Sequence, residues 1–209
     1  MNAIELFERC FRDSPLVAII RGVTPHEVEE IGEALVKGGI RIIEVPLNSP
    51  DPLASIGRLA ARFGGDVLIG AGTVLRPGQV QEVRDAGGQL VVSPNTNAAV
   101  IRATVEAGMV SSPGIFTPSE AFEALENGAH ALKLFPAEGA SPEVVKAIRA
   151  VLPKEVRLLV VGGVTPESVG PWLDAGANGF GLGGALYKPG QSAAETLEKA
   201  RAFAAAVLR

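Results

Sequence analysis

The sequence predicts a (β/α)8 TIM barrel that is preceded by one N-terminal helix. Three observations favour this fold class: eight short apolar segments recur along the 209 residues, segments with helical spacing separate them, and a glycine ends most of the helical segments. Near-continuous runs of Val, Ile and Leu are typical of parallel strands that are buried on both faces. Eight repeats of strand, loop and helix make the compact form of this barrel.

The apolar segments mark the expected strands. In chain order they are LVAIIRG (residues 16–22), IRIIEVPL (40–47), VLIGAGT (67–73), QLVVSP (89–94), MVSSPG (109–114), ALKLFP (131–136), RLLVVGG (157–163) and GFGLGG (179–184). Their lengths suit strands better than helices, which need ten residues or more. We therefore expect eight parallel strands in this order.

The segments between the strands carry signals for the start and end of helices. Ser or Thr followed by Pro occurs at residues 24–25, 117–118, 141–142 and 165–166, which suits an N-cap and the first helical position. Glu27 and Glu120 stand three residues after their threonines and predict capping boxes. The helical segments end at glycines that suit left-handed C-caps, namely Gly38, Gly64, Gly87, Gly108, Gly128 and Gly176.

The alternative architecture is an open, doubly wound sheet. For a dinucleotide, that fold needs G-x-G-x-x-G after the first strand, and RGVTPH lacks this motif, while GAGTVL supplies only its first two glycines. No shift in composition divides the chain. We therefore expect residues 1–209 to form a single barrel domain.

Composition and charge exclude several classes of function. The formal net charge is −4, and acidic and basic residues are interspersed, so no basic surface for nucleic acid is expected. The N-terminal segment carries charges every few residues, and no later apolar run reaches membrane-spanning length, which predicts a cytoplasmic protein without a membrane partner. One cysteine and two histidines make no cluster with metal-ligand spacing, so neither a disulfide nor a metal is expected.

Lys133 is the residue that the pattern explains least as structure. It lies inside an apolar strand segment, whereas the other five lysines fall on expected helices or loops. In a barrel, a strand lysine that faces the confined interior has a lowered pKa, and a neutral amine can attack a ketone to form a Schiff base. The alternative interpretation, in which Lys133 only neutralises a buried carboxylate, remains open at this point.

Two further charged residues fall near strand ends, where barrels place their active sites. Glu44 lies near the end of the second strand segment, and is either the salt-bridge partner of Lys133 or a general acid/base beside it. Arg21 ends the first segment, and its planar guanidinium suits either Glu44 or a carboxylate or phosphate of a substrate.

Small and uncharged residues complete the expected mouth of the barrel. Two glycine pairs follow the last two strands, where barrels commonly bind phosphate through backbone N–H groups; they are Gly162 with Gly163 and Gly183 with Gly184. Thr73 and Asn95 also follow strands and can donate hydrogen bonds there, although each also suits a turn. Trp172, Tyr187, His26 and His130 are expected to have no catalytic role.

Six segments together resemble a known family. VAIIRGVTP, IIEVPLNSP, LIGAGTVLRPGQV, VVSPN, PGIFTPSEAFEALENGAHALKLFPAE and VVGGVTPESV are similar, in this order from about residue 15 to 190, to the class I aldolases that cleave 2-keto-3-deoxy-6-phospho sugar acids. The resemblance implies a homotrimeric barrel that splits its phosphorylated keto-deoxy sugar acid into pyruvate and glyceraldehyde 3-phosphate, with no cofactor and no metal.

The resemblance also implies roles for individual residues. Lys133 falls on the Schiff-base lysine and Glu44 on the proton-transfer glutamate of the family. Thr73 would hold the pyruvate carboxylate, and Arg21 would contact the substrate. Pro94 and Phe135 would shape the pocket, and Gly162 and Gly163 would bind the phosphate.

Two positions resemble the branch that acts on the galactonate-derived substrate. Asn48 stands where enzymes for the gluconate-derived C4 epimer have an arginine, and Val161 stands where they have a threonine. The chain departs from both branches at Gly184, where a serine is usual, so unphosphorylated keto acids remain possible substrates. The gluconate-type acid and 4-hydroxy-2-oxoglutarate are the alternatives within the family; a phosphosugar isomerase, an epimerase or a sugar-phosphate binder is the alternative outside it.

Overall fold

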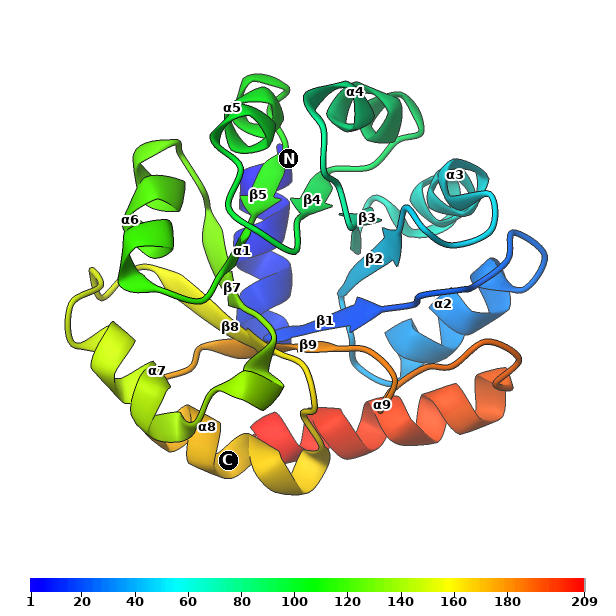
Figure 1. Cartoon of the computed structure of the whole chain (residues 1–209). Helices are drawn as coiled ribbons and strands as arrows, with labels where there is room; N and C mark the ends of the chain where they lie inside the picture. The colour runs from blue at the N-terminus through cyan, green and yellow to red at the C-terminus, as the bar shows by residue number, and fades with distance from the viewer. Residues whose placement is uncertain (209) are drawn as a thin grey trace.

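The structure is a computed structural model that describes residues 1–208, and it confirms the barrel. All strand pairs are parallel, in the order β5-β4-β3-β2-β1-β9-β8-β7-β6. The strands are β1 (Leu16–Ile19), β2 (Ile42–Pro46), β3 (Leu68–Gly72), β4 (Leu90–Val92), β5 (Val110–Ser112), β6 (Gly114–Ile115), β7 (Ala131–Leu134), β8 (Arg157–Val161) and β9 (Gly179–Leu182). Figure 1 shows them as a ring surrounded by the later helices, with the N-terminal helix lying across the ring.

The fifth expected strand is split into β5 and β6 at Pro113. Proline has no N–H to donate to a neighbouring strand, so the ladder is interrupted there. The barrel nevertheless closes, because the N–H groups of His130 and Lys133 donate to the carbonyl oxygens of Ser111 and Pro113, each at 2.9 Å. The first bond reaches β5 and the second reaches the break, while parallel pairing of Gly114 with Lys133 joins β6 to β7.

One helix follows each barrel strand, as expected from the alternating pattern. Within residues 1–208 the helices are α1 (Ala3–Asp13), α2 (Val28–Lys37), α3 (Pro52–Phe63), α4 (Pro77–Asp85), α5 (Ala98–Glu106), α6 (Pro118–Glu126), α7 (Pro142–Arg149), α8 (Val169–Asp174) and α9 (Ala193–Val207), with short 3-10 helices η1 (Ala137–Gly139) and η2 (Pro166–Ser168). None of these helices is long and apolar enough to cross a membrane.

The helix-start signals hold in part. Thr117 caps α6, Pro118 takes the first helical position, and the capping box with Glu120 forms. The other predicted box forms only by half: the Glu27 carboxylate accepts the Thr24 N–H at 2.9 Å, but α2 begins at Val28 after a turn. Proline restricts backbone torsion without ensuring that a full helical turn follows at once.

The glycine prediction also needs correction at two helices. Gly87, Gly108, Gly128 and Gly176 have positive φ angles, as a left-handed C-cap requires. After α2 the positive φ of +96° belongs to Gly39, whereas Gly38 is right-handed. Gly64 after α3 is also right-handed, with φ −61°.

Two apolar clusters hold the barrel together. The outer cluster lies between the strands and the surrounding helices and contains most of the buried aliphatic residues. The inner cluster fills the barrel itself, with Val17, Ile42, Leu90 and Leu159 among its members, and α1 closes one end through Phe7. Because the interior is packed up to Lys133, the open end of the barrel is the end where the strands terminate.

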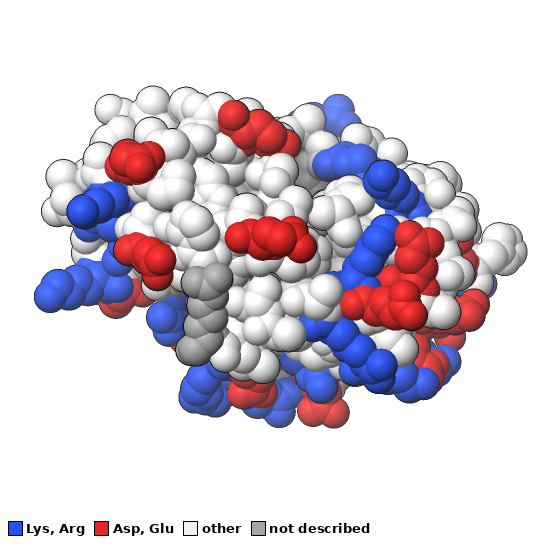
Figure 2. Space-filling model, turned by 90° about the horizontal axis from the view of Figure 1, so that it is seen from below, with Lys and Arg blue, Asp and Glu red and all other residues white. Residues whose placement is uncertain are grey.

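Charged residues are distributed over the outside. In the view of Figure 2, acidic and basic side chains are intermixed on the surface. Part of this arrangement is a network between α2 and α3, in which Arg62 pairs with Glu29 at 3.3 Å and with Glu33 at 2.7 Å.

Candidate active site

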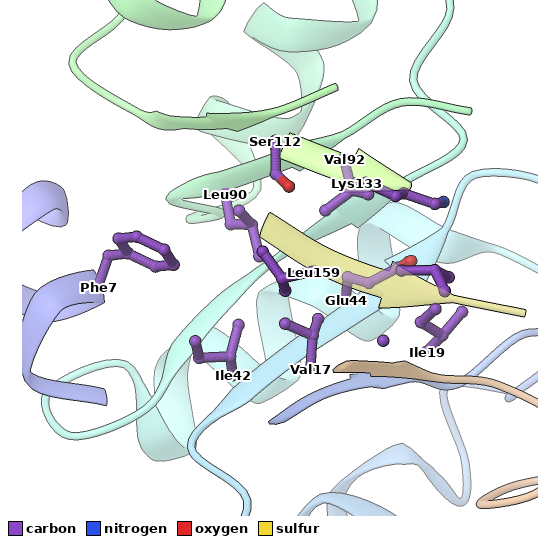
Figure 3. A pocket seen from close by; sticks show the side chains of 12 residues that line it. Phe7, Val17, Ile19, Ile42, Glu44, Leu90, Val92, Ser112, Lys133 and Leu159 are labelled. Carbon is purple, nitrogen blue, oxygen red and sulfur yellow. The ribbon is translucent and has the colours of Figure 1, made fainter. Parts of the chain in front are cut away.

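Lys133 and Glu44 are the two buried charged residues inside the barrel. Lys133 on β7 is 8% exposed and Glu44 on β2 is 2% exposed. Both line a small cavity of about 20 Å³ in the apolar interior. Figure 3 shows their side chains extending toward the same end of this cavity, while Phe7 of α1 stands at the opposite end.

Burial changes the pKa of both groups in the direction that makes them reactive. Burial raises the pKa of the Glu44 carboxyl from 4.5 to about 7, and the nearby charges of Lys133 and Arg21 oppose this rise. Burial also lowers the pKa of the Lys133 ammonium from its ordinary 10.5; the charge of Glu44 opposes this change and Arg21 adds to it. Near neutral pH, Glu44 can therefore give or take a proton, and Lys133 is more readily neutral.

The two side chains differ in their local contacts. The Lys133 Nζ lies 4.5 Å from the centre of the Phe135 ring, two residues along the same strand direction. Oxygen Oε2 of Glu44 is buried and has no hydrogen-bond partner in the described chain. Burying a carboxylate oxygen without a partner costs free energy, and such oxygens in a cleft commonly bind a substrate or water.

Gly72 makes room for Glu44. A side chain on Gly72, at the end of β3, would overlap both carboxylate oxygens of Glu44. Sequence analysis gave this glycine no role of its own, although it used the segment as a strand and assigned a role to Thr73 beside it. Only the register brings the two residues together, since β2 and β3 pair in parallel with Pro46 beside Gly72, and the sequence carries no local signal for it.

A larger cavity of about 530 Å³ opens above the pair at the ends of the strands. Lys133 lines both cavities and therefore connects the interior to the mouth. The predicted residues that line the mouth with it are Arg21, Thr73, Pro94, Phe135, Val161, Gly162, Gly163, Gly183 and Gly184. The structure thus brings together residues from six of the barrel strands or the loops that follow them.

Thr73 has an unusual backbone. Its φ of +57° lies in the left-handed region, which β-branched residues rarely adopt. Strained residues of this kind cluster at active sites and ligand clamps, where the surrounding structure holds them in place. The strained backbone at Thr73 therefore indicates that the loop after β3 is part of the site.

Besides Glu44, which lines only the inner cavity, two predicted residues lie outside the mouth. Asn48 does not line the cavity, but its Oδ1 accepts a hydrogen bond from Nη1 of Arg21 at the rim. Asn95 is exposed and its amide contacts only the carbonyl oxygen of Thr96, at 3.5 Å. The structure therefore gives Asn95 no place in the site.

The mouth also contains residues that sequence analysis passed over. Glu138 of η1 and Lys188 after β9 add one negative and one positive charge. Tyr187, expected only to pack, lines the mouth, and its hydroxyl donates to Oε1 of Glu27 at 3.2 Å. The available signal was that each of the three residues lies shortly after the end of a predicted strand.

The histidines take no part in this site. Nδ1 of His130 accepts the N–H of Ser111 at 3.1 Å, near the start of β7. His26 is exposed in the turn before α2 and does not line the mouth. Among residues 1–208, no three His, Cys, Asp or Glu side chains gather in a geometry for a metal ion.

Comparisons with known proteins point to one family. Residues 7–201 match the family described as KDPG and KHG aldolase. The chain is 48% identical, over 189 residues that cover 90% of it and 92% of the relative, to the 2-dehydro-3-deoxy-6-phosphogalactonate aldolase of Escherichia coli (strain K12).

Two solved structures share the fold closely. "Native KDPGal structure" has a TM-score of 0.91 and 47% identity, with 92% of this chain and 93% of that chain covered. A "cube-shaped, highly porous protein cage designed by fusing symmetric oligomeric domains" has the same TM-score of 0.91 and 47% identity, with 92% of this chain and 72% of that chain covered.

Proposed function

The chain belongs to the KDPG and KHG aldolase family, and on this premise we propose that it cleaves 2-dehydro-3-deoxy-6-phosphogalactonate to pyruvate and D-glyceraldehyde 3-phosphate through a Schiff base. As an aldolase it is a lyase. The observation that carries the mechanism is the buried pair of Lys133 and Glu44 at the base of the mouth. Membership of an aldolase family does not support the isomerase, epimerase or binding alternatives.

The first half of the mechanism makes an electron sink. The neutral amine of Lys133 attacks the C2 ketone, and a proton from Glu44 helps the resulting hydroxyl leave as water. The iminium that forms carries a positive charge next to C3. Desolvation supports this step, because it lowers the pKa of Lys133 and raises that of Glu44.

The second half breaks the carbon chain. The Glu44 carboxylate takes the proton of the C4 hydroxyl, the C3–C4 bond breaks, and its electrons move to the iminium nitrogen to give an enamine and the aldehyde. Glu44 returns the proton to C3, and water then releases pyruvate and restores Lys133. The unpartnered Oε2 of Glu44 supports this role, since no hydrogen bond from residues 1–208 occupies it.

The rest of the mouth supports binding of the substrate along its length. Thr73 would hold the pyruvate carboxylate, and Pro94 and Phe135 would form the walls beside it. Arg21 would contact a hydroxyl or carboxylate, and the glycine pairs would bind the phosphate. In support of the last role, no acceptor among residues 1–208 takes the N–H of Gly163 or of Gly184.

The preference for the galactonate-derived acid rests on two residues and on the relatives. Asn48 is uncharged and accepts a hydrogen bond from the Arg21 guanidinium at the rim, and Val161 presents an apolar side chain to the mouth. The relative from Escherichia coli, which is similar over nine-tenths of the chain, is named as an aldolase of 2-dehydro-3-deoxy-6-phosphogalactonate. The gluconate-derived acid and 4-hydroxy-2-oxoglutarate are the second candidates, which the family description favours.

We also propose a homotrimer in the cytoplasm. Large apolar side chains are exposed, including Leu75 at 47%, Phe116 at 40% and Phe122 at 40%, and a subunit contact would cover such surface. The similarity to a designed cage of symmetric oligomeric domains supports self-association. The single free cysteine, Cys10, suits a reducing compartment. Light scattering on the protein as it elutes from a size-exclusion column would give the molar mass of the assembly, and a monomer would contradict the trimer.

Two experiments test the proposed reaction. Borohydride with pyruvate should attach one pyruvate-derived group to Lys133, detected by peptide mass, and Lys133→Ala should lose both the label and nearly all turnover while remaining folded. Values of kcat/KM for the two C4-epimeric phosphorylated acids should favour the galactonate-derived one. Equal rates would mean that Asn48 and Val161 do not determine specificity, and normal turnover by Lys133→Ala would exclude the mechanism.

A further inference from the structure

An unpaired carboxylate stands in the mouth, at a place where the substrate is an anion. Glu138 lies in η1, a few residues after Lys133, and lines the 530 Å³ cavity. It is exposed, and within residues 1–208 its carboxylate has neither an ion pair nor a hydrogen bond from another side chain. Lys188 and Arg21 line the same cavity without forming an ion pair. Catalysis as proposed above does not use Glu138.

The Glu138 side chain packs against the first glycine pair. A side chain on Gly162 would overlap Oε2 of Glu138, and one on Gly163 would lie 2.9 Å from its Cγ. Both glycines have positive φ angles, +118° and +63°. The space left by their missing side chains is therefore taken by a carboxylate in the free protein.

The second glycine pair differs in this respect. A side chain on Gly183 or Gly184 would have no heavy atom within 4 Å, so this part of the mouth is open. A phosphate held between the two pairs would meet open space on the side of Gly183 and the Glu138 carboxylate on the side of Gly162. Like charges at such short range repel, and the repulsion is strongest where water is partly excluded.

We propose that Glu138 covers the phosphate subsite of the free enzyme and that a phosphate must displace it. Because Glu138 is exposed, its side chain can turn into solvent when a phosphate binds. The repulsion between its carboxylate and the phosphate weakens the binding of phosphorylated substrates only. Glu138 is thus a specificity-determining residue: it reduces the preference for phosphorylated over unphosphorylated keto-deoxy acids. The inference rests on the proposed function in taking the glycine pairs as the phosphate subsite.

The direct test is the binding of inorganic phosphate, which needs no turnover. Glu138→Gln keeps the size of the side chain and removes its charge. Titration calorimetry should show that this variant binds phosphate about three to ten times more tightly than the natural protein, the range expected for one exposed charge acting on a dianion. The gain should shrink at about 1 M salt, because screening weakens interactions between exposed charges.

A matched control separates this local effect from a change in net charge. Glu126→Gln removes an equal charge at the C-terminal end of α6, which lies next to the start of β7 and not at the mouth. This variant should bind phosphate as the natural protein does. If Glu138→Gln binds phosphate equally or more weakly, or if Glu126→Gln shows the same gain, the inference is wrong.

Kinetics provide the second test. The ratio of kcat/KM for the phosphorylated acid to that for its unphosphorylated form should rise about three- to tenfold in Glu138→Gln. A lower ratio would mean that Glu138 assists the phosphorylated substrate, contrary to the inference. If the natural protein cleaves neither phosphorylated epimer, the proposed function fails, while the phosphate titration still decides the role of Glu138.

Discussion

Replacement of Glu44 by glutamine removes one ionisable group from the centre of the barrel and changes little else. The side chain is 2% exposed, and glutamine has nearly the same shape. If Glu44 transfers the protons of the reaction, Glu44→Gln should lower kcat by about 10²- to 10⁴-fold, the usual contribution of a positioned general acid or base. The variant should still form some iminium with pyruvate, because Lys133 remains.

The structure also predicts the pH at which Glu44 acts. Its pKa is raised to about 7 because burial penalises the carboxylate. When cleavage of the C3–C4 bond limits turnover, the base form that takes the C4 hydroxyl proton should be about nine-tenths populated at pH 8 and about 3% populated at pH 5.5, so kcat should fall about 30-fold between these values. A carboxyl with the ordinary pKa of 4.5 would produce almost no change over the same range.

The assay must separate Glu44 from the phosphate of the substrate, which itself has a pKa near 6. Pyruvate release should be measured in quenched samples from pH 5.5 to 9, with both the phosphorylated acid and its unphosphorylated form. Glu126→Gln controls for the loss of one negative charge, and circular dichroism checks that each variant is folded. The acidic fall with the unphosphorylated acid reports on the enzyme alone.

Two results would refute this reasoning. If Glu44→Gln kept the acidic fall near pH 7 with the unphosphorylated acid, another group would be responsible for it. If the natural enzyme showed no fall above pH 5.5, the carboxyl would not have the raised pKa that its burial implies. The first outcome would move the proton transfer away from Glu44, and the second would remove the raised pKa from the argument.

Two further predictions concern packing and stability. Gly72→Ala should displace the Glu44 carboxylate, destabilise the fold by about 1–3 kcal/mol and reduce kcat/KM by about 10²-fold. The control Gly78→Ala adds a methyl group in open space and should change neither stability nor activity. Urea unfolding and kinetics measure both effects, and equal behaviour of the two variants would contradict the prediction. Because folding raises the Glu44 pKa from 4.5 to about 7, its contribution to stability is complete below pH 4.5 and is lost as the pH rises through 7, by about 3 kcal/mol. Unfolding free energies measured across this range should therefore fall in the natural protein and not in Glu44→Gln, and parallel curves would disprove the assignment.

The alternation of apolar strands with capped helices was sufficient to predict the barrel. Burial on both faces leaves a continuous apolar run in each strand, so this information is local and can be recognised in the sequence. The same pattern singled out Lys133, because a charge inside such a run conflicts with burial and requires a reason. Its place within a strand predicted its burial, and the structure shows that it faces the barrel interior.

Local patterns were less informative where the backbone leaves regular structure. Gly38 and Gly64 end helices as expected but are right-handed. After α2 the neighbouring Gly39 takes the positive φ, whereas none of residues 64–67 after α3 does so. The strand at Pro113 is split for a local reason, the missing N–H, yet its closure depends on bonds from β7. Composition alone predicts neither outcome.

The sequence by itself determined the fold class, the strand order along the chain and the two buried charges. Only the tertiary structure decided which side chains meet: Glu44 with the space left by Gly72, Arg21 with Asn48, and Glu138 with the glycine pair after β8. The physical reason is that periodicity and capping act over a few residues, whereas these contacts join segments far apart in the chain. Their distances are set by strand register and barrel closure, which no local pattern specifies.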